Sequence, residues 1–224
     1  MRLPLRKAFV IAWKDILSES RTRDILSSVA VFALLTIVIF NFAFEPGSDN
    51  VELVAPGVLW VTFTFAGVLG LGRSFVFEKE KGCLEGLLLC PVDRDVVYLG
   101  KMLGSLAFML TVEIIVVPIF LVLFDLPLFL PQLALITLLA TVGFVSVGTL
   151  FSALAVNTRA RDVMLPILFF PIVAPVIIAA VQASGLALEG QSWSTMSSWL
   201  QIMGVFDAIF IVISALVFEF VVEE

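Results

Sequence analysis

The sequence predicts an all-α polytopic membrane protein with six transmembrane helices, and three observations support this fold class. Of the 224 residues, 61% are hydrophobic and only 14% are charged, with a mean hydropathy of +1.14, whereas soluble proteins are about half apolar and about a quarter charged. Six apolar stretches are each long enough to cross a bilayer. All Lys and Arg residues fall on one side of the resulting layout, as the positive-inside rule describes.

The N-terminal segment, residues 3–20, predicts an amphipathic helix along the inner membrane surface. Large apolar residues recur in it at helical spacing: Leu5, Phe9, Trp13, Ile16 and Leu17. Basic residues are interspersed among them, and such residues suit anionic lipid headgroups, while Trp suits the membrane interface. We therefore expect residues 1–24 to form an interfacial helix in contact with membrane lipids. An ordinary cytoplasmic start to the first span is the alternative.

Six apolar stretches then predict the spans: residues 25–44, 53–75, 102–124, 133–156, 163–183 and 203–222. Each is close to the length that crosses about 30 Å of hydrocarbon. The first is too long for a signal-peptide core and does not end in a small-x-small cleavage pattern, so we expect nothing to be removed. The spans leave no room for a soluble domain, and we expect one transmembrane domain over residues 1–224.

The basic residues set the expected orientation. Every Lys and Arg falls in one of three segments: 2–23, 73–101 and 159–161. The loops on the other side contain acidic residues but no Lys or Arg: 45–52, 125–132 and 184–202. An excess of Lys and Arg marks cytoplasmic loops, so we expect both termini in the cytoplasm. The net charge of −6 then reflects the outer loops and acids within the spans.

Composition also narrows the chemistry. The sequence has no histidine, which argues against zinc hydrolases and Ser-His hydrolases. Cys83 and Cys90 lie in a predicted cytoplasmic segment, where thiols stay reduced, so we expect no disulfide; two thiols alone do not build a closed zinc site. The nearest match to a phosphate-binding Walker A loop, Gly67–Ser74, has Arg73 in place of the lysine and lies in an apolar helix. We expect no catalytic residues, no metal site and no nucleic-acid partner.

The segment 73–101 predicts a short amphipathic helix over residues 76–91, between the second and third spans. Its apolar side carries Phe77, Leu84, Leu87 and Leu88. Charged residues fall elsewhere on the helix, and Pro91 ends it before a charged turn. A helix of this kind is suited to docking in a groove on a cytosolic partner.

Residues in and around this helix carry a family resemblance: Ala55-Pro56-Gly57, Trp60, Glu78, Gly82, Leu84-Glu85 and Pro91. In these positions the chain resembles the CcmB family, the haem exporter permeases of cytochrome c maturation. The resemblance is most specific over residues 53–105 and continues through Val97, Lys101 and the proline-bearing fifth span. It implies a permease of the ABC-2 type that has no nucleotide site and is driven by a separate CcmA-type ATPase.

By position, the resemblance implies that residues 76–91 couple ATPase closure to the membrane helices. The coupling residues would be Glu78, Gly82, Leu84, Glu85 and Leu88. Glu85 is our first choice, because a carboxylate accepts charge-assisted hydrogen bonds from a partner.

The resemblance further implies a bacterial inner-membrane protein with partners of the CcmA, CcmC, CcmD and CcmE types and two permease copies per ATPase dimer. ATP and Mg²⁺ would bind the ATPase. This chain would bind no cofactor of its own, and haem would be a ligand that it transports or handles. The motion would either export haem or release the loaded CcmE-type chaperone. Two rival functions stay open: a permease for a lipid, glycan or drug, and a membrane scaffold that transports nothing.

Several residues within the spans invite a functional interpretation. Glu113 lies near the middle of the third span, where an ionisable group is costly; it is either a proton or substrate site or a protonated carboxyl bonded to another helix. Pro166, Pro171 and Pro175 bend the fifth span, as a hinge, as part of a pathway, or for packing alone.

Two further features concern packing and the membrane surface. Gly100 and Gly104 form a G-x-x-x-G pattern that favours close packing, either within the chain or between copies. Asp207 and Glu219 are expected within reach of headgroups or water near opposite ends of the sixth span.

Overall fold

The computed structural model describes residues 2–44, 51–80, 86, 92–127, 130–156 and 161–222, and all regular structure in them is α-helical. The helices are α1 (Arg2–Thr22), α2 (Asp24–Ala43), α3 (Val51–Glu80), α5 (Arg94–Leu123), α6 (Pro131–Val156), α7 (Arg161–Leu188) and α8 (Trp193–Val222). Six of them, α2 to α8, are long and apolar enough to cross a membrane. The all-helical, six-span fold class is confirmed.

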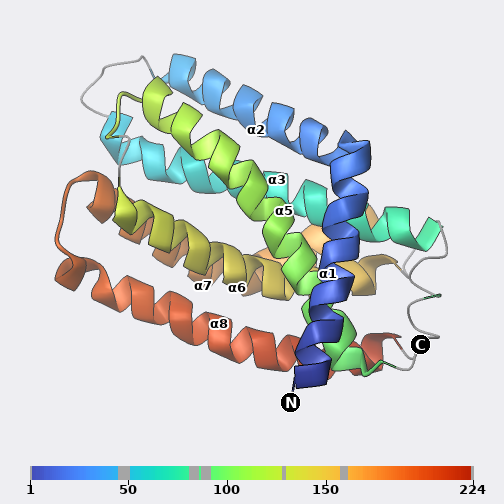
Figure 1. Ribbon diagram of the computed structural model, residues 1–224. Helices are drawn as coiled ribbons and strands as arrows, with labels where there is room; N and C mark the ends of the chain where they lie inside the picture. Colours follow the sequence, from blue (N-terminus) through green and yellow to red (C-terminus); the bar gives the residue numbers. More distant parts are fainter. Residues whose placement is uncertain are drawn as a thin grey trace.

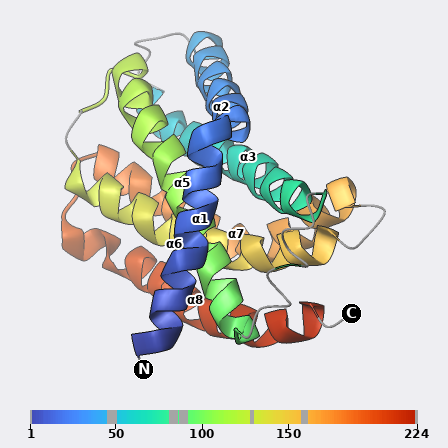
Figure 2. The same cartoon turned by 45° about the vertical axis from the view of Figure 1, so that its right-hand side comes forward.

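The six spans run alongside one another, and α1 lies across them (Figure 1). At one end of the bundle α2, α5 and α7 begin and α3, α6 and α8 end. The Lys and Arg residues of the helices belong to α1 or to the parts of α3, α5 and α7 nearest this end, which we call the basic end. The second view shows α1 crossing the first half of α5 there (Figure 2).

Helix α6 occupies the centre of the bundle and packs against α3, α5, α7 and α8. Residues 143–150 are all buried, so this part of α6 is enclosed on every side. Small residues make the enclosure possible: a Cβ at Gly148 would overlap the side chain of Leu71 of α3. In hydrocarbon, where helices associate through close packing, small residues of this kind let the backbones approach.

Side-chain hydrogen bonds also connect the spans to one another. The indole Nε1 of Trp60 in α3 donates to Ser184 Oγ in α7 at 2.9 Å. Near the basic end, the Tyr98 hydroxyl of α5 donates to the carbonyl of Ser146 in α6, also at 2.9 Å. Toward the opposite end, Asn41 Nδ2 of α2 donates to the carbonyl of Leu123 at 2.6 Å. Such bonds contribute about 0.6 kcal/mol each on average, so they orient helices more than they stabilise them.

The chain turns sharply between α1 and α2. Arg23 makes the turn with φ of 57°, a left-handed conformation that is uncommon for a residue with a side chain. Glu19 reaches across the turn, and its Oε1 accepts a hydrogen bond from the backbone N–H of Leu26 at 2.8 Å. That N–H is one of the first donors of α2, which lack partners within the helix, and a negative charge is favoured there. Glu19 therefore stabilises the bend that carries α1 across the bundle.

Several helix boundaries differ from the sequence prediction. Helix α3 continues to Glu80, into the predicted helix 76–91, and α5 begins at Arg94, eight residues before the predicted third span. We expected a loop over residues 184–202, but α7 continues to Leu188 and α8 begins at Trp193. Gly190, with φ of 72°, ends α7 with hydrogen bonds from its own N–H to Ala187 O and from Gln191 N–H to Leu186 O, as in a Schellman motif. The polar residues that resembled a loop form the first turns of α8.

Candidate functional site

The predicted coupling segment joins α3 to α5. Glu78 belongs to the last turn of α3, which ends at Glu80. Gly82, Leu84, Glu85 and Leu88 lie outside the described residues, as do Cys83 and Cys90. Their proposed roles stay predictions. A force applied to this segment would act first on the last turn of α3 and the first turn of α5.

The start of α5 is held by α1 along a seam of small residues. A Cβ added at Gly100 would lie 2.7 Å from Ile11 Cβ and 2.9 Å from the carbonyl oxygen of Ala8. One turn later, a Cβ at Gly104 would lie 3.2 Å from Asp15 Cβ. The G-x-x-x-G pattern thus serves packing within the chain, and its partner is α1.

The two faces of α1 carry side chains of different size. Ala8, Ile11 and Ala12 are buried against the bundle, whereas the large residues predicted to face the membrane are exposed: Leu5, Phe9, Trp13, Ile16 and Leu17. Exposed apolar side chains at the basic end suit a helix that lies in the membrane interface. Helix α1 therefore has one face for α5 and another for lipid.

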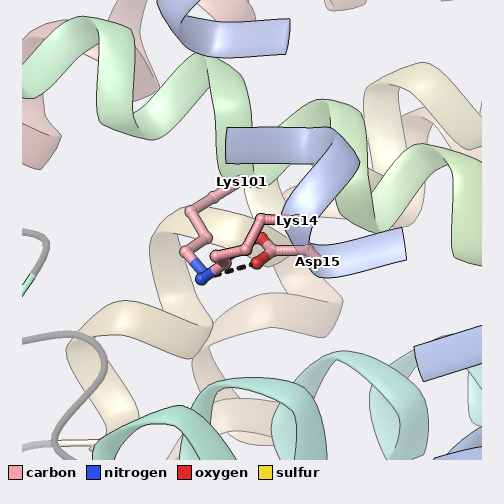
Figure 3. Close-up of polar contacts among 3 residues, drawn as sticks. All are labelled: Lys14, Asp15 and Lys101. Carbon is pink, nitrogen blue, oxygen red and sulfur yellow. Dashed lines mark hydrogen bonds and ion pairs between the residues drawn. The ribbon is translucent and has the colours of Figure 1, made fainter. Parts of the chain in front are cut away.

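An ion pair lies at the end of this seam (Figure 3). Lys101 of α5 is buried, with 3% of its side chain exposed, and its Nζ donates to Asp15 Oδ2 of α1 at 3.0 Å. Lys14, which is half-exposed, lies 2.9 Å from the other oxygen, Asp15 Oδ1. A buried ammonium group is tolerated where an opposite charge and hydrogen bonds compensate it. Asp15 supplies that charge, so the pair joins α1 to the third span.

The environment of Asp15 sets its charge. Burial favours the neutral carboxyl and would raise its pKa, but the ammonium groups of Lys101 and Lys14 act against it, and the net result is a pKa below the ordinary value of 3.8. Asp15 is therefore ionised at neutral pH. Beside it, a cavity of about 170 Å³ is lined by residues of α1, α2, α3 and α5, among them Asp15, Glu19 and Lys101.

Glu113 lies inside the bundle, on the face of α5 that meets α6. It is 3% exposed, and its Oε1 accepts a hydrogen bond from Thr141 Oγ1 of α6 at 2.5 Å. This contact is a bond to another helix, as one of the two interpretations of Glu113 predicts. The second carboxyl oxygen, Oε2, is buried and has no hydrogen-bond partner among the described residues, so the contact with Thr141 does not account for the whole group.

The three prolines all lie within α7. Pro171 and Pro175 are exposed on the surface of the bundle, so neither lines the interior of this chain. Each proline removes a backbone donor of the helix. A role in a hinge, or in a path shared with a second copy, stays a prediction for Pro166, Pro171 and Pro175.

Asp207 is deeper than we expected. Only 6% of it is exposed, and it packs on Gly143 of α6, where a Cβ would overlap Asp207 Oδ1. The prediction of a residue near headgroups or water was wrong because α8 begins at Trp193, ten residues before the predicted span, which places Asp207 roughly four turns inside the helix.

The ion pair between Asp15 and Lys101 was not predicted. In the sequence, Lys101 contributes only to the family resemblance, and no pattern singles out Asp15. A weak signal exists in the spacing, because Ala8, Ile11, Ala12 and Asp15 share one helical face. The spacing does not predict which helix packs against that face.

Comparisons with known proteins agree with the fold. A family model described as CcmB protein matches residues 6–223. Heme exporter protein B of Pseudomonas aeruginosa is 29% identical over 176 residues, which are 78% of this chain and 79% of that protein. The Rhodobacter capsulatus protein of the same name is 29% identical over 166 residues, or 70% and 75% of the two chains. That of Paracoccus denitrificans is 26% identical over 178 residues, or 79% and 81%.

Proposed function

The chain belongs to the CcmB family, and we propose that it is the membrane permease subunit of an ABC-type haem exporter that acts in cytochrome c maturation. The observation that carries this proposal is the family match over residues 6–223, in a chain with six helices long and apolar enough to span a membrane. We name haem as the substrate because the relatives are named for its export.

Energy for the permease comes from a separate subunit in this proposal. The sequence contains no Walker A loop, so a CcmA-type ATPase would bind ATP and Mg²⁺, with two permease copies on an ATPase dimer. The complex would lie in the bacterial inner membrane. The basic end, and with it both termini, would face the cytoplasm, because Lys and Arg concentrate on that side of multi-pass proteins.

Coupling would begin at residues 76–91. In this role Glu78, Gly82, Leu84, Glu85 and Leu88 contact the ATPase, and its closure displaces the segment. The segment begins within the end of α3, which runs to Glu80, and α5 begins three residues after it, at Arg94. Both helices would therefore move with it, without any intervening domain.

Helix α1 would follow α5 in this motion. The seam at Gly100 and Gly104 leaves no room between the two helices, and the ion pair between Asp15 and Lys101 adds a charged contact. Packed helices shift as units, because close-packed interfaces do not deform continuously. The motion would pass from α1 through the turn at Arg23 to α2.

The motion has two candidate outcomes. It either moves haem outward or releases a haem-loaded CcmE-type chaperone from a CcmC-type protein, with a CcmD-type protein in the same complex. Both use the same coupling segment. In either case haem would be a ligand that the complex transports or handles, and not a permanently bound cofactor of this chain.

Co-purification tests the proposal. The tagged chain is extracted from its native membrane in a gentle detergent, and the proteins that accompany it are identified by mass spectrometry. An ABC ATPase together with CcmC-type or CcmE-type proteins supports the proposed function. An ATPase without those proteins indicates a permease for another substrate, such as a lipid, glycan or drug, and the absence of any ATPase indicates a scaffold that transports nothing.

A further inference from the structure

A cleft of about 540 Å³ lies between α5 and α6, on the half of the bundle away from the basic end. Its walls include Glu113, Ile114, Val117 and Pro118 of α5, and Ala134 and Thr137 of α6. The volume falls in the range of small-molecule sites, about 300–1,000 Å³. Most of the wall is apolar, as in sites that hold an apolar ligand and orient it with a few polar groups.

Two buried polar oxygens of residues in this wall have no hydrogen-bond partner within the described parts of the chain. They are Oε2 of Glu113 and Oγ1 of Thr137. Thr137 precedes Thr141 by one helical turn and so shares its face of α6, and Thr141 contacts the other oxygen of the same Glu113 carboxyl. Glu113 and Thr137, the residues that carry these two oxygens, therefore line one cleft from facing helices.

Buried polar groups without partners are rare in folded proteins and call for an explanation. Here both groups belong to the same cleft, so one ligand group would satisfy both. Pro118 also removes the backbone N–H that would otherwise bond to the carbonyl of Ile114 in the cleft wall. The groups of this apolar wall that can still form hydrogen bonds therefore lie close together.

The chemistry of these groups specifies the ligand. An isolated carboxylate within hydrocarbon is strongly disfavoured, so Glu113 is neutral and its carboxyl has one hydrogen to donate. Thr137 contributes a hydroxyl that donates and accepts. A carboxyl group on the ligand complements both, while an apolar body contacts the rest of the wall.

Access is from the side of the bundle. Ile114, in the cleft wall, is 72% exposed, and Leu138 of α6 is exposed on the same lining. In the membrane these surfaces meet lipid rather than water. A ligand that dissolves in the hydrocarbon region therefore reaches the cleft without passing through the centre of the bundle.

We propose that the α5–α6 cleft binds haem through one of its carboxyl groups, which Glu113 and Thr137 hold by hydrogen bonds. Haem combines an apolar macrocycle with carboxyl side chains and so matches both parts of the wall. The identity of the ligand rests on the proposed function, whereas the existence of a site for an apolar carboxylic acid rests on the cleft alone.

The test measures binding of two fluorescent probes to the purified full-length chain in lipid nanodiscs. The probes are metal-free protoporphyrin IX, which keeps the carboxyl groups of haem, and cis-parinaric acid, a fatty acid. Thr137→Val removes the hydroxyl and keeps the side-chain shape, and Glu113→Leu removes the carboxyl. Thr36→Val is the matched control, because the Thr36 hydroxyl is bonded to Phe32 O of its own helix, α2, and is absent from the cleft lining.

We expect Thr137→Val and Glu113→Leu each to weaken protoporphyrin binding about tenfold, since each removes a hydrogen bond to a buried group. Glu113→Gln should bind nearly as well as the original chain, because an amide still donates and accepts. The dimethyl ester of protoporphyrin, which cannot donate, should bind more weakly than the free acid. Thr36→Val should change nothing.

Two outcomes would overturn the proposal. If protoporphyrin binds the double variant with Glu113→Leu and Thr137→Val as tightly as the original chain, the cleft does not hold it. If only parinaric acid responds to these substitutions, the site takes a lipid acid and the assignment to haem is wrong. Because the readout is binding by this chain alone, its failure is distinct from a failure to co-purify with an ATPase.

Discussion

Lys101 of α5 and Asp15 of α1 form an ion pair 3.0 Å long, with the ammonium group almost completely buried. The two residues are 86 positions apart in sequence, and they join the helix that crosses the basic end to the third span. Through this contact and the glycine seam beside it, the surface helix and the span form one packed unit.

Removing Asp15 should destabilise the protein. Asp15→Ala leaves the buried ammonium group of Lys101 without its carboxylate, which costs about 3–5 kcal/mol for pairs of this kind. Thermal unfolding in detergent micelles measures the loss. The double variant with Asp15→Leu and Lys101→Met should recover most of it, because replacing both charges by apolar groups is often neutral.

Lys14→Ala is the control for that series. Lys14 contacts the same carboxyl from a half-exposed position, and exposed ion pairs contribute less than about 1 kcal/mol. A loss as large as that of Asp15→Ala would contradict the dominant role of Lys101.

The stability contributed by Asp15 should depend on pH. Its folded-state pKa lies below 3.8, its ordinary value, so the folded state favours the ionised form more than the unfolded state does. The contribution is complete above pH 3.8 and is lost as the pH falls through the lower folded-state pKa. Unfolding midpoints of the original chain and Asp15→Asn should therefore differ at pH 7 and converge well below pH 3.8. A constant difference across that range would contradict the assignment.

Gly100→Ala should displace α1 from α5. The added Cβ would lie 2.7 Å from Ile11 Cβ and 2.9 Å from a backbone oxygen, and overpacking of this kind costs about 1–3 kcal/mol. Limited proteolysis within α1, together with thermal unfolding, reports the effect. Gly204→Ala in α8 meets nothing within 4 Å and should be neutral or slightly stabilising, because alanine favours helix.

Glu85→Arg should abolish association with the ATPase, because it reverses the charge at the residue proposed to accept hydrogen bonds from the partner. Co-purification of the tagged chain measures the association. Glu219→Arg is the matched control, since Glu219 is exposed near the end of α8 at the basic end but lies outside the coupling segment. Retained ATPase binding by Glu85→Arg would remove the basis for the coupling role.

Cysteine labelling should locate the two ends of the bundle. In a chain with both native cysteines replaced by serine, Ser192→Cys should react with an impermeant thiol reagent added outside intact spheroplasts, since Ser192 is exposed between α7 and α8. In a second chain, with only Cys90 replaced by serine, the native Cys83 should react only after the membrane is opened. The reverse pattern would overturn the orientation inferred from the basic residues.

The spans could be predicted because hydrophobicity is a local property of the chain. The start of α8 could not, because its first turns from Trp193 are polar and the feature that shortens the preceding loop is the backbone conformation of Gly190. That error in the boundary led directly to the wrong depth for Asp207.

In the candidate site, too, some features could be predicted from the sequence and others could not. The depth of Glu113 follows from its position in a span, but Thr141 as its partner depends on how α5 and α6 face each other. The glycines of the α5 seam carried a packing signal, whereas nothing local to Asp15 indicated Lys101. Contacts between distant helices are tertiary, and periodicity within one helix does not specify them.

The proposed role in cytochrome c maturation is tested most directly in a bacterium lacking its own CcmB-family gene. We expect this chain, produced with its cognate ATPase, to restore covalent haem attachment to cytochrome c, and Glu85→Arg at equal membrane abundance to fail. Haem staining of cytochrome c after denaturing electrophoresis measures both. Full maturation with Glu85→Arg would contradict the coupling role of this residue, and no maturation with the original chain in its assembled complex would contradict the proposed function.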